Sequence, residues 1–180
     1  KGVDKPVALI GVAEKGYVTL TLAATATPGH SSLPPPDTAI GKLSAALARL
    51  ESKPFPASVS GVMRETLETA APEMNFGSRL ALSNLWLLEP LVRAQLEKTA
   101  QTAAAIRTTT ALTIFNAGNK ENVLPGRAEA TVNFRLLPGE AEDSVIARVK
   151  SIVADDRITV TPLPGNTNPP PRTSTTTPSY

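Results

Sequence analysis

Alternating apolar and polar positions are the clearest pattern in the chain, and they run through residues 17–27 and 128–136. The apolar positions of these two segments are Val18, Leu20, Leu22, Ala24, Ala26, Ala128, Ala130, Val132, Phe134 and Leu136. Alternation with a period of two is typical of a strand with one buried face. Shorter apolar or β-branched stretches at 7–13, 106–116 and 157–162 predict three further strands.

Helical spacing appears in two segments, residues 37–52 and 140–153. The apolar side chains that recur there are Ile40, Leu43, Leu47, Leu50, Val145, Ile146, Val149 and Ile152. Asp37 follows three prolines and is predicted to cap the first of these helices. Residues 58–100 are predicted to be helical in at least two pieces, separated around residues 72–77.

This order of strands and helices predicts an α+β fold, with one antiparallel sheet and helices on one face. We expect a single domain over residues 1–162, with a helical insertion at about 57–105. Residues 163–180 are rich in Pro, Thr and Asn and are predicted to form a linker or a disordered tail. Because Lys1 is not an initiator, we interpret the chain as a segment of a longer protein.

Composition excludes several classes of function. The chain has 18 Lys and Arg residues against 16 Asp and Glu residues, and the basic residues are scattered, which argues against a nucleic-acid partner. No apolar run reaches the roughly 18 residues that cross a bilayer, so no membrane contact is expected from this segment. The chain has one histidine and no cysteine. Since catalytic zinc usually takes three protein ligands, no metal site is expected within it.

His30 is the first candidate for chemistry. A histidine in a loop is usually a plain surface residue, but this one follows Gly29 and precedes two serines and three prolines. Glycine allows close approach to another surface, and prolines restrict the path of the loop. The serine hydroxyls can bond the loop backbone. Such a loop can hold an imidazole rigidly as a donor to a developing oxyanion.

Asn122 and Arg135 are the other candidates. An asparagine in a loop is normally a turn former, and an arginine on a strand is normally a solvated charge. An arginine can also hold a carboxylate with two parallel hydrogen bonds, and an asparagine can donate to a carbonyl oxygen. We hypothesise that the strand between them brings both to one end of the sheet. The acidic pair Asp155 and Asp156 is interpreted as solvated charge.

Two stretches carry a resemblance to a known family, TPGHSSLPPPDTAIGKLSAALARL and NVLPGRAEATVNFRLLPG. With the helix and strand that follow, they resemble the lid, or dimerisation, domain of the aminoacylase and carboxypeptidase family of metallopeptidases (the M-twenty family). The segment is most similar to the carboxypeptidase S-like and N-acyl-amino-acid hydrolase branch, in which the lid carries a long helical insertion.

The resemblance implies a ferredoxin-like lid with a four-stranded antiparallel sheet and two helices, which pairs with a second lid to form a homodimer. It implies two zinc ions in a catalytic domain outside this segment, and a peptide or N-acyl amino acid substrate cleaved beside a free carboxylate. His30 matches the lid histidine that stabilises the oxyanion in a neighbouring active site. Asn122 and Arg135 match the residues that hold the carbonyl and the carboxylate. The segment alone is then expected to be inactive.

Two other functions remain open from the residues alone. The chain is also compatible with a stand-alone interaction module that dimerises through sheet edges or through the Leu80–Leu88 helix. A small α+β nucleic-acid binder is the second alternative. Scattered charge and an aromatic content of 4% argue against it, because base stacking uses aromatic side chains.

Overall fold

The computed structural model describes residue 6 and residues 11–170, which form two compact units. The first, which we call the sheet unit, consists of residues 15–55 and 109–170. The second, the helical unit, has residues 56–108 as its main part. Most of the strand predicted at 7–13 lies outside the described residues, and residues 11–13 are not in a strand.

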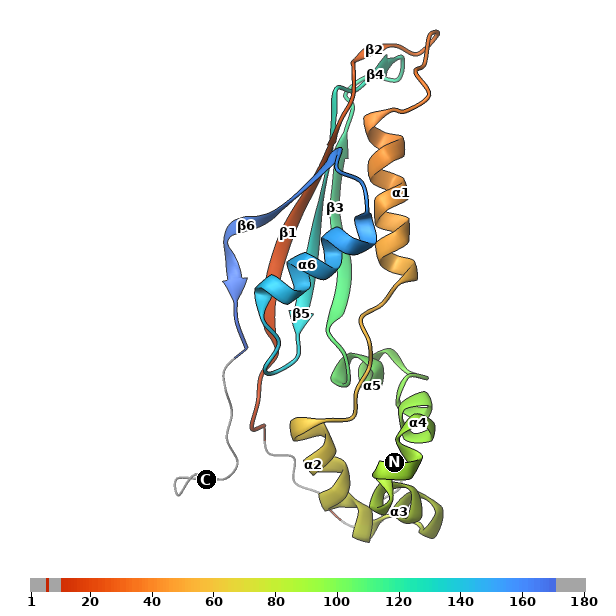
Figure 1. Ribbon diagram of the computed structural model, residues 1–180, viewed down its shortest axis with the longest axis vertical. Helices are drawn as coiled ribbons and strands as arrows, with labels where there is room; N and C mark the ends of the chain where they lie inside the picture. The colour runs from red at the N-terminus through yellow and green to blue at the C-terminus, as the bar shows by residue number, and fades with distance from the viewer. Residues whose placement is uncertain (1–5, 7–10, 171–180) are drawn as a thin grey trace. The chain divides into compact units, whose positions relative to one another are not determined.

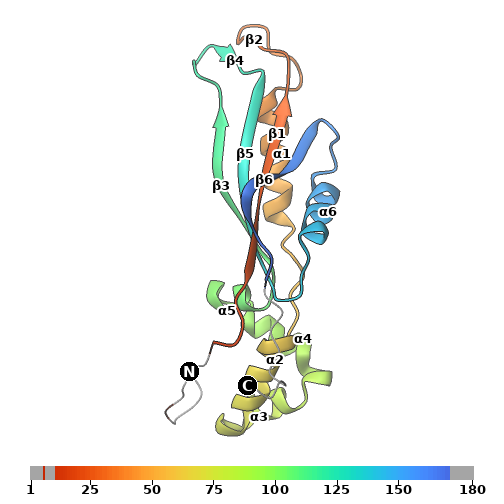
Figure 2. The ribbon, with the colours of Figure 1, turned by 90° about the vertical axis from the view of Figure 1, so that its left-hand side faces the viewer.

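A four-stranded sheet in the order β3-β5-β1-β6 forms the centre of the sheet unit, and all its neighbouring strands are antiparallel. Its strands are β1 (Gly16–Thr25), β3 (Thr109–Ala117), β5 (Arg127–Leu136) and β6 (Ile158–Asn168). Helices α1 (Ala39–Ser52) and α6 (Glu142–Val153) lie on the same side of it (Figures 1 and 2). This is the βαββαβ arrangement of ferredoxin-like folds, so the predicted α+β fold is confirmed.

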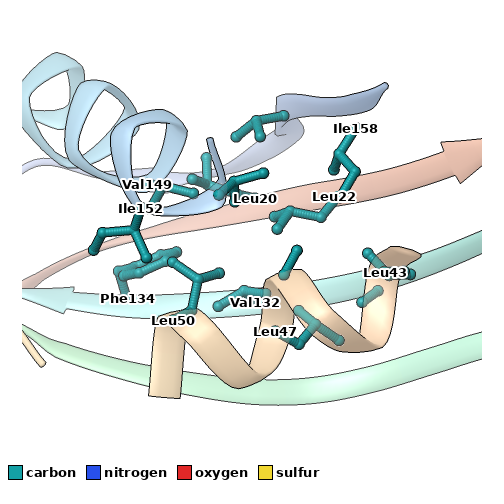
Figure 3. Close-up of a cluster of buried hydrophobic side chains, with 14 of the residues drawn as sticks. Leu20, Leu22, Leu43, Leu47, Leu50, Val132, Phe134, Val149, Ile152 and Ile158 are labelled. Atoms are coloured by element: carbon teal, nitrogen blue, oxygen red, sulfur yellow. The ribbon is translucent and has the colours of Figure 1, made fainter. Parts of the chain in front are cut away.

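The core lies between the sheet and these two helices. The apolar positions of β1 and β5 face Leu43, Leu47 and Leu50 of α1 and the apolar side of α6, as Figure 3 shows. Phe134 is fully buried, with its ring edge-on to Phe55 at a centroid separation of 5.9 Å. Each large apolar side chain contributes roughly 1.5–3 kcal/mol on burial, so the alternating positions of β1 and β5 contribute substantially to stability, together with the apolar side chains of α1 and α6.

Polar side chains on the opposite face of the sheet are joined across three strands. The Asn133 side-chain amide donates to the Thr19 hydroxyl at 2.9 Å, and that hydroxyl donates to Asn166 Oδ1 at 3.3 Å. Thr19 is only 5% exposed. These hydrogen bonds compensate the burial of its hydroxyl, because a buried polar group without a partner is costly.

The N-cap of helix α1 lies one residue after the capping residue predicted from the sequence. Thr38 is the N-cap, and its hydroxyl accepts from the backbone N–H of Gly41 at 3.0 Å. The predicted capping residue, Asp37, instead pairs with Arg157 at 2.7 Å. Asp and Thr are both good caps, and the long-range ion pair of Asp37 is a tertiary interaction that local sequence does not reveal.

Strand β6 extends into the segment predicted to be a linker. It pairs with β1 from Ala24↔Ile158 to Tyr17↔Asn168, with a register shift between Val18 and Leu20. Proline is tolerated on an edge strand, where the missing N–H faces away from the neighbouring strand. Gly165 has a φ of +73°, which suits an irregularity in the strand. Composition typical of a linker therefore also fits an irregular edge strand; residues 171–180 lie outside the described part.

The helical unit contains α2 (Gly61–Ala70), a 3₁₀ turn (Ala71–Glu73), α3 (Phe76–Ser83), α4 (Leu85–Leu96) and α5 (Ala100–Ala105). Its small core consists of Val59, Ala71, Leu82, Leu85 and Val92. The predicted Leu80–Leu88 helix is divided between α3 and α4, and several of its apolar side chains are exposed: Leu80 is 51%, Trp86 79% and Leu87 61% exposed. Within the described residues, no helix has both the length and the apolar character that a bilayer crossing requires.

Candidate functional site

The β1/β5 ladder continues past the sheet as a narrow two-stranded arm. The Ala26 N–H donates to the Gly126 carbonyl at 3.0 Å, just beyond the end of β1. Strands β2 (Gly29–His30) and β4 (Val123–Leu124) then pair with each other in an antiparallel manner. Figures 1 and 2 show them past one end of the sheet, and we call this part of the chain, residues 26–33 and 120–126, the tip.

His30 lies at the tip, opposite Val123, with its side chain exposed. Its Nδ1 atom is 2.8 Å from the Ser32 hydroxyl and accepts a hydrogen bond from the Ser32 backbone N–H at 3.2 Å. A backbone N–H can only donate, so this bond requires an unprotonated Nδ1. The ring proton of the neutral imidazole is then on Nε2, and this N–H is left to bind a group from outside.

Asn122 is brought to the same place by its backbone. Its carbonyl accepts from the Ser31 N–H at 3.0 Å, one residue beyond the β2/β4 pairs. Its side-chain Oδ1 is covered and makes no hydrogen bond within the part of the chain that the structure describes. The structure therefore joins Asn122 to the His30 segment and leaves an amide oxygen without a partner.

Arg135 lies at the other end of the sheet, so the hypothesis that it meets Asn122 at one end is wrong. In the β1/β5 ladder, Arg127 pairs with Thr25 near the tip, and Arg135 pairs with Tyr17 at the far end. The eight residue steps between the two arginines correspond to about 27 Å at roughly 3.4 Å per step. Strand β5 runs from Arg127 to Leu136 without a turn, so its two ends lie far apart. The number of residues between Asn122 and Arg135 did not reveal this.

The far end of the ladder carries positive charge. Arg135 is exposed, and its guanidinium lies 5.6 Å from the centre of the Tyr17 ring. The pKa of Lys15 is lowered from its usual 10.5, first by burial and then by the Arg135 cation, with Glu140 acting in the opposite direction. These two cations favour a bound anion at this end.

Two interactions were not found by sequence reasoning. The two serines after His30 were expected to bond the loop backbone, but Ser32 bonds the imidazole ring. Asp155 was interpreted as solvated, whereas it forms a salt bridge with Arg157 at 2.8 Å. The hydrogen bonds from Arg157 lower the pKa of Asp155 from 3.8 to about 2. Both interactions could have been anticipated from the sequence, because His30 and Ser32, and likewise Asp155 and Arg157, are only two residues apart.

Metal-ligating side chains do not gather in the described part of the chain. Among residue 6 and residues 11–170, no three His, Asp or Glu side chains lie together in a way that holds a metal ion. Since a catalytic zinc site takes three protein ligands, the described residues do not fit one.

The model of one known protein family matches most of this chain. The model of the peptidase dimerisation domain matches residues 12–159, which include the whole tip and the far end of the ladder at Arg135. The chain belongs to this family.

Several curated proteins are similar to this dimerisation domain. The N-fatty-acyl-amino acid synthase/hydrolase of Homo sapiens is 50% identical over 155 residues, which are 86% of this chain and 31% of that protein. A probable carboxypeptidase S-like protein of Dictyostelium discoideum is 41% identical over 182 residues, which cover 99% of this chain and 34% of that protein. The dimerisation domain therefore spans about a third of the length of these relatives.

Solved structures share the fold of the dimerisation domain. A metallo-carboxypeptidase from Sulfolobus solfataricus has a TM-score of 0.52 and 19% identity, covering 92% of this chain and 46% of that one. Human carnosine dipeptidase 1 has the same TM-score at 11% identity, covering 92% of this chain and 41% of that one. At these identities the likeness concerns the fold alone.

Proposed function

We propose that this chain is the dimerisation and substrate-capping domain of a zinc-dependent carboxypeptidase or amidohydrolase, which cleaves an amide bond next to a free carboxylate. The observation that carries the proposal is His30, held on an arm beyond the sheet with Nε2–H left to bind a group from outside. A donor in this position serves a reaction that takes place on another surface.

The substrate class is supported by what the relatives' names have in common. One group acts on N-fatty-acyl amino acids, and the other is described as carboxypeptidase S-like. An N-acyl amino acid and the C-terminal residue of a peptide both place an amide one carbon away from a free carboxylate. A site for either compound needs a donor for the amide oxygen and a cation for the carboxylate.

The hydrolytic machinery belongs, in this proposal, to a catalytic domain outside the chain. That domain is expected to hold two zinc ions, which supply an activated water. The described residues of this chain do not fit a zinc site. The chain by itself is therefore expected to be inactive, and its own residues contribute binding, orientation and charge stabilisation.

At the tip, His30 and Asn122 are assigned to the amide group of the substrate. The Nε2–H of His30 donates to the oxygen as negative charge develops on it during hydrolysis. Asn122 is assigned to the carbonyl oxygen of the substrate, to which its side-chain N–H group donates; its Oδ1 can only accept and makes no hydrogen bond within the described residues. Two exposed apolar residues lie beside them, Leu33 and Val123, as expected for a surface that becomes covered in the assembly.

At the far end, Arg135 is assigned to the substrate carboxylate, and Lys15 adds to the positive charge there. About 27 Å separates the two ends of the ladder, at roughly 3.4 Å for each residue step. One domain therefore cannot place both groups on one small substrate. In a homodimer, the tip of one subunit can complete the site in which the partner subunit's own Arg135 binds the carboxylate.

Self-association is supported by the contrast between the two sheet edges. Strand β3 forms one edge with nine residues, TTALTIFNA, none of them charged and none a proline. Ile114 and Phe115 on this strand are 51% and 43% exposed. Strand β6 forms the other edge and contains Pro162, Pro164 and Gly165. A long apolar edge without proline or charge favours pairing with another strand, so we assign the homodimer contact to β3.

The test of this function is the variant His30→Ala in the complete protein. Loss of one oxyanion donor is expected to lower kcat by about 10²–10³-fold, with KM and zinc content unchanged. Ser31→Ala, on the same loop, serves as the matched control and should retain most of the activity, because Ser31 contacts Asn122 through its backbone N–H. A decrease in kcat of less than about threefold for His30→Ala would remove His30 from the mechanism.

A second measurement tests the carboxylate assignment. Arg135→Ala is expected to weaken substrates with a free carboxylate far more than their carboxamide analogues. Equal losses on both compounds would contradict the assignment. Activity that does not respond to either variant would favour the alternative, an interaction module without a catalytic role.

A further inference from the structure

The imidazole of His30 is bonded on one side only, and the bonds come from a single residue. The Ser32 hydroxyl is 2.8 Å from Nδ1, and the Ser32 backbone N–H donates to the same nitrogen at 3.2 Å. Since the backbone N–H has no acceptor function, it fixes the nitrogen as the acceptor. The hydroxyl can rotate, and it donates to Nδ1 in this arrangement.

The backbone around Ser32 is itself well defined. The Leu33 N–H donates to the His30 carbonyl at 3.2 Å, which closes a turn with Ser31 and Ser32 at its centre. In this turn, the ring nitrogen of the first residue accepts from the N–H of the third. Asp and Asn make the same type of bond with a side-chain oxygen in Asx turns. The Ser31 N–H to Asn122 carbonyl bond, at 3.0 Å, holds the turn against β4.

We propose that Ser32 is a positioning residue for the reaction, which keeps the proton of the His30 ring on Nε2 and fixes the direction in which Nε2–H points. This inference rests on the function proposed above, in which Nε2–H stabilises the substrate oxyanion. A donor is effective in the transition state only if it is already oriented. Without the Ser32 hydroxyl, only the longer bond from the Ser32 backbone N–H, at 3.2 Å, holds the ring. The ring then samples other rotamers and the tautomer with the proton on Nδ1 more often, and neither presents this donor.

Nuclear magnetic resonance tests the hydrogen bond independently of activity. The sequence contains a single histidine, so the imidazole nitrogen signals belong to His30 without further assignment. In a long-range ¹H–¹⁵N spectrum of the full chain with neutral imidazole, we expect Nδ1 at the acceptor position and Nε2 at the protonated position. Ser32→Ala should move the two signals toward each other, as exchange between tautomers does. Ser32→Thr, which retains the hydroxyl, should restore them.

Ser31→Ala is the matched control. Ser31 is exposed and adjacent, and its hydroxyl makes no hydrogen bond in the described part of the chain. Its backbone N–H is retained in the variant, so the contact with Asn122 is preserved. The two nitrogen signals should stay where they are in the unmodified protein. Signals that respond equally to Ser31→Ala and Ser32→Ala would overturn the inference, as would signals that respond to neither.

Kinetics of the complete protein test the consequence. Ser32→Ala is expected to lower kcat by about threefold to tenfold and to leave KM unchanged, because one neutral hydrogen bond is lost while the backbone N–H remains. Ser32→Thr should recover most of the loss. If His30→Ala is inactive and Ser32→Ala has full activity, the positioning role is wrong and the function stands. If His30→Ala itself is fully active, the proposed function has failed, and the positioning role fails with it.

Discussion

Mixing two impaired variants of the complete protein, His30→Ala and Arg135→Ala, tests whether the two ends of the ladder, from different subunits, serve the same active site. Arg127 pairs with Thr25 and Arg135 with Tyr17, so eight residue steps separate the ends of this ladder. At roughly 3.4 Å per step, they span about 27 Å, and His30 lies beyond the near end. In the proposed substrates, the amide and the carboxylate are only one carbon apart.

The two possible arrangements predict different outcomes. If the tip acts on the partner's site, a hybrid dimer has one complete site, on the subunit that lacks His30 but retains Arg135. Random exchange of equal amounts makes half of the dimers hybrids, so about a quarter of the unmodified activity should return. This is about 25- to 250-fold above the His30→Ala protein, given a loss of about 10²–10³-fold in that variant. If one domain serves one site, the mixture regains nothing.

The assay measures hydrolysis at a substrate concentration below KM, before and after subunit exchange. Differently tagged subunits and native mass spectrometry report the fraction of hybrids. Each variant exchanged with itself is the control and should keep its low activity. Activity that stays at the level of the separate variants, although half of the dimers are hybrids, would refute the shared site. It would also refute the argument that the separation of the two ends requires two subunits to complete one site.

Three further predictions concern the fold and its assembly. Phe134→Ala removes a fully buried ring that packs on Phe55, and it should lower the free energy of unfolding by about 3–5 kcal/mol in urea titrations; a loss below about 1 kcal/mol would contradict the core assignment. Ile114→Lys should convert the proposed dimer to a folded monomer in light scattering, and a dimer that persists would exclude the β3 edge. Asp155 has a pKa lowered from 3.8 to about 2 by Arg157, so its contribution to stability is present above the unfolded pKa and is lost as the pH falls toward 2. Asp155→Asn should therefore reduce the acid dependence of the melting temperature, and unchanged dependence would show that the pair is not formed.

Sequence patterns predicted the centre of the fold because the relevant forces are local or periodic. The alternation in residues 17–27 and 128–136 identified two strands, β1 and β5, and their buried faces. Helical spacing identified α1 and α6, which supply the other half of the core. Periodicity records which side chains are withdrawn from water, and burial of these side chains is what holds the sheet and the helices together.

The errors arose where tertiary contacts compete with local preference. Asp37 has the chemistry of a helix cap, but its ion pair with Arg157 leaves that role to Thr38. Pro164 and Gly165 lie in the segment predicted to be a linker, although an edge strand with an irregularity accommodates them. In each case, the deciding partner lies more than a hundred residues away in sequence.

The sequence suggested which residues to consider for the candidate site, but not how they are arranged. The segment that contains His30 and the segment that contains Asn122 meet through the β2/β4 pairs. Nothing in the spacing of Asn122 and Arg135 revealed that the intervening strand runs straight, away from the tip. The hydrogen bond between Ser32 and the imidazole was also missed. A serine hydroxyl at this position can bond either the loop backbone or the ring, and the sequence does not decide between them.

The unlike edges of the sheet also limit how large an assembly can become. A strand that pairs in an antiparallel manner with its own copy uses the same surface on both subunits, and the contact is complete after two. Growth past this point would need a second bare edge, and Pro162 and Pro164 interrupt the one on β6. In the proposed homodimer, association would therefore stop at a closed pair, and Pro162 and Pro164 would disfavour growth through β6.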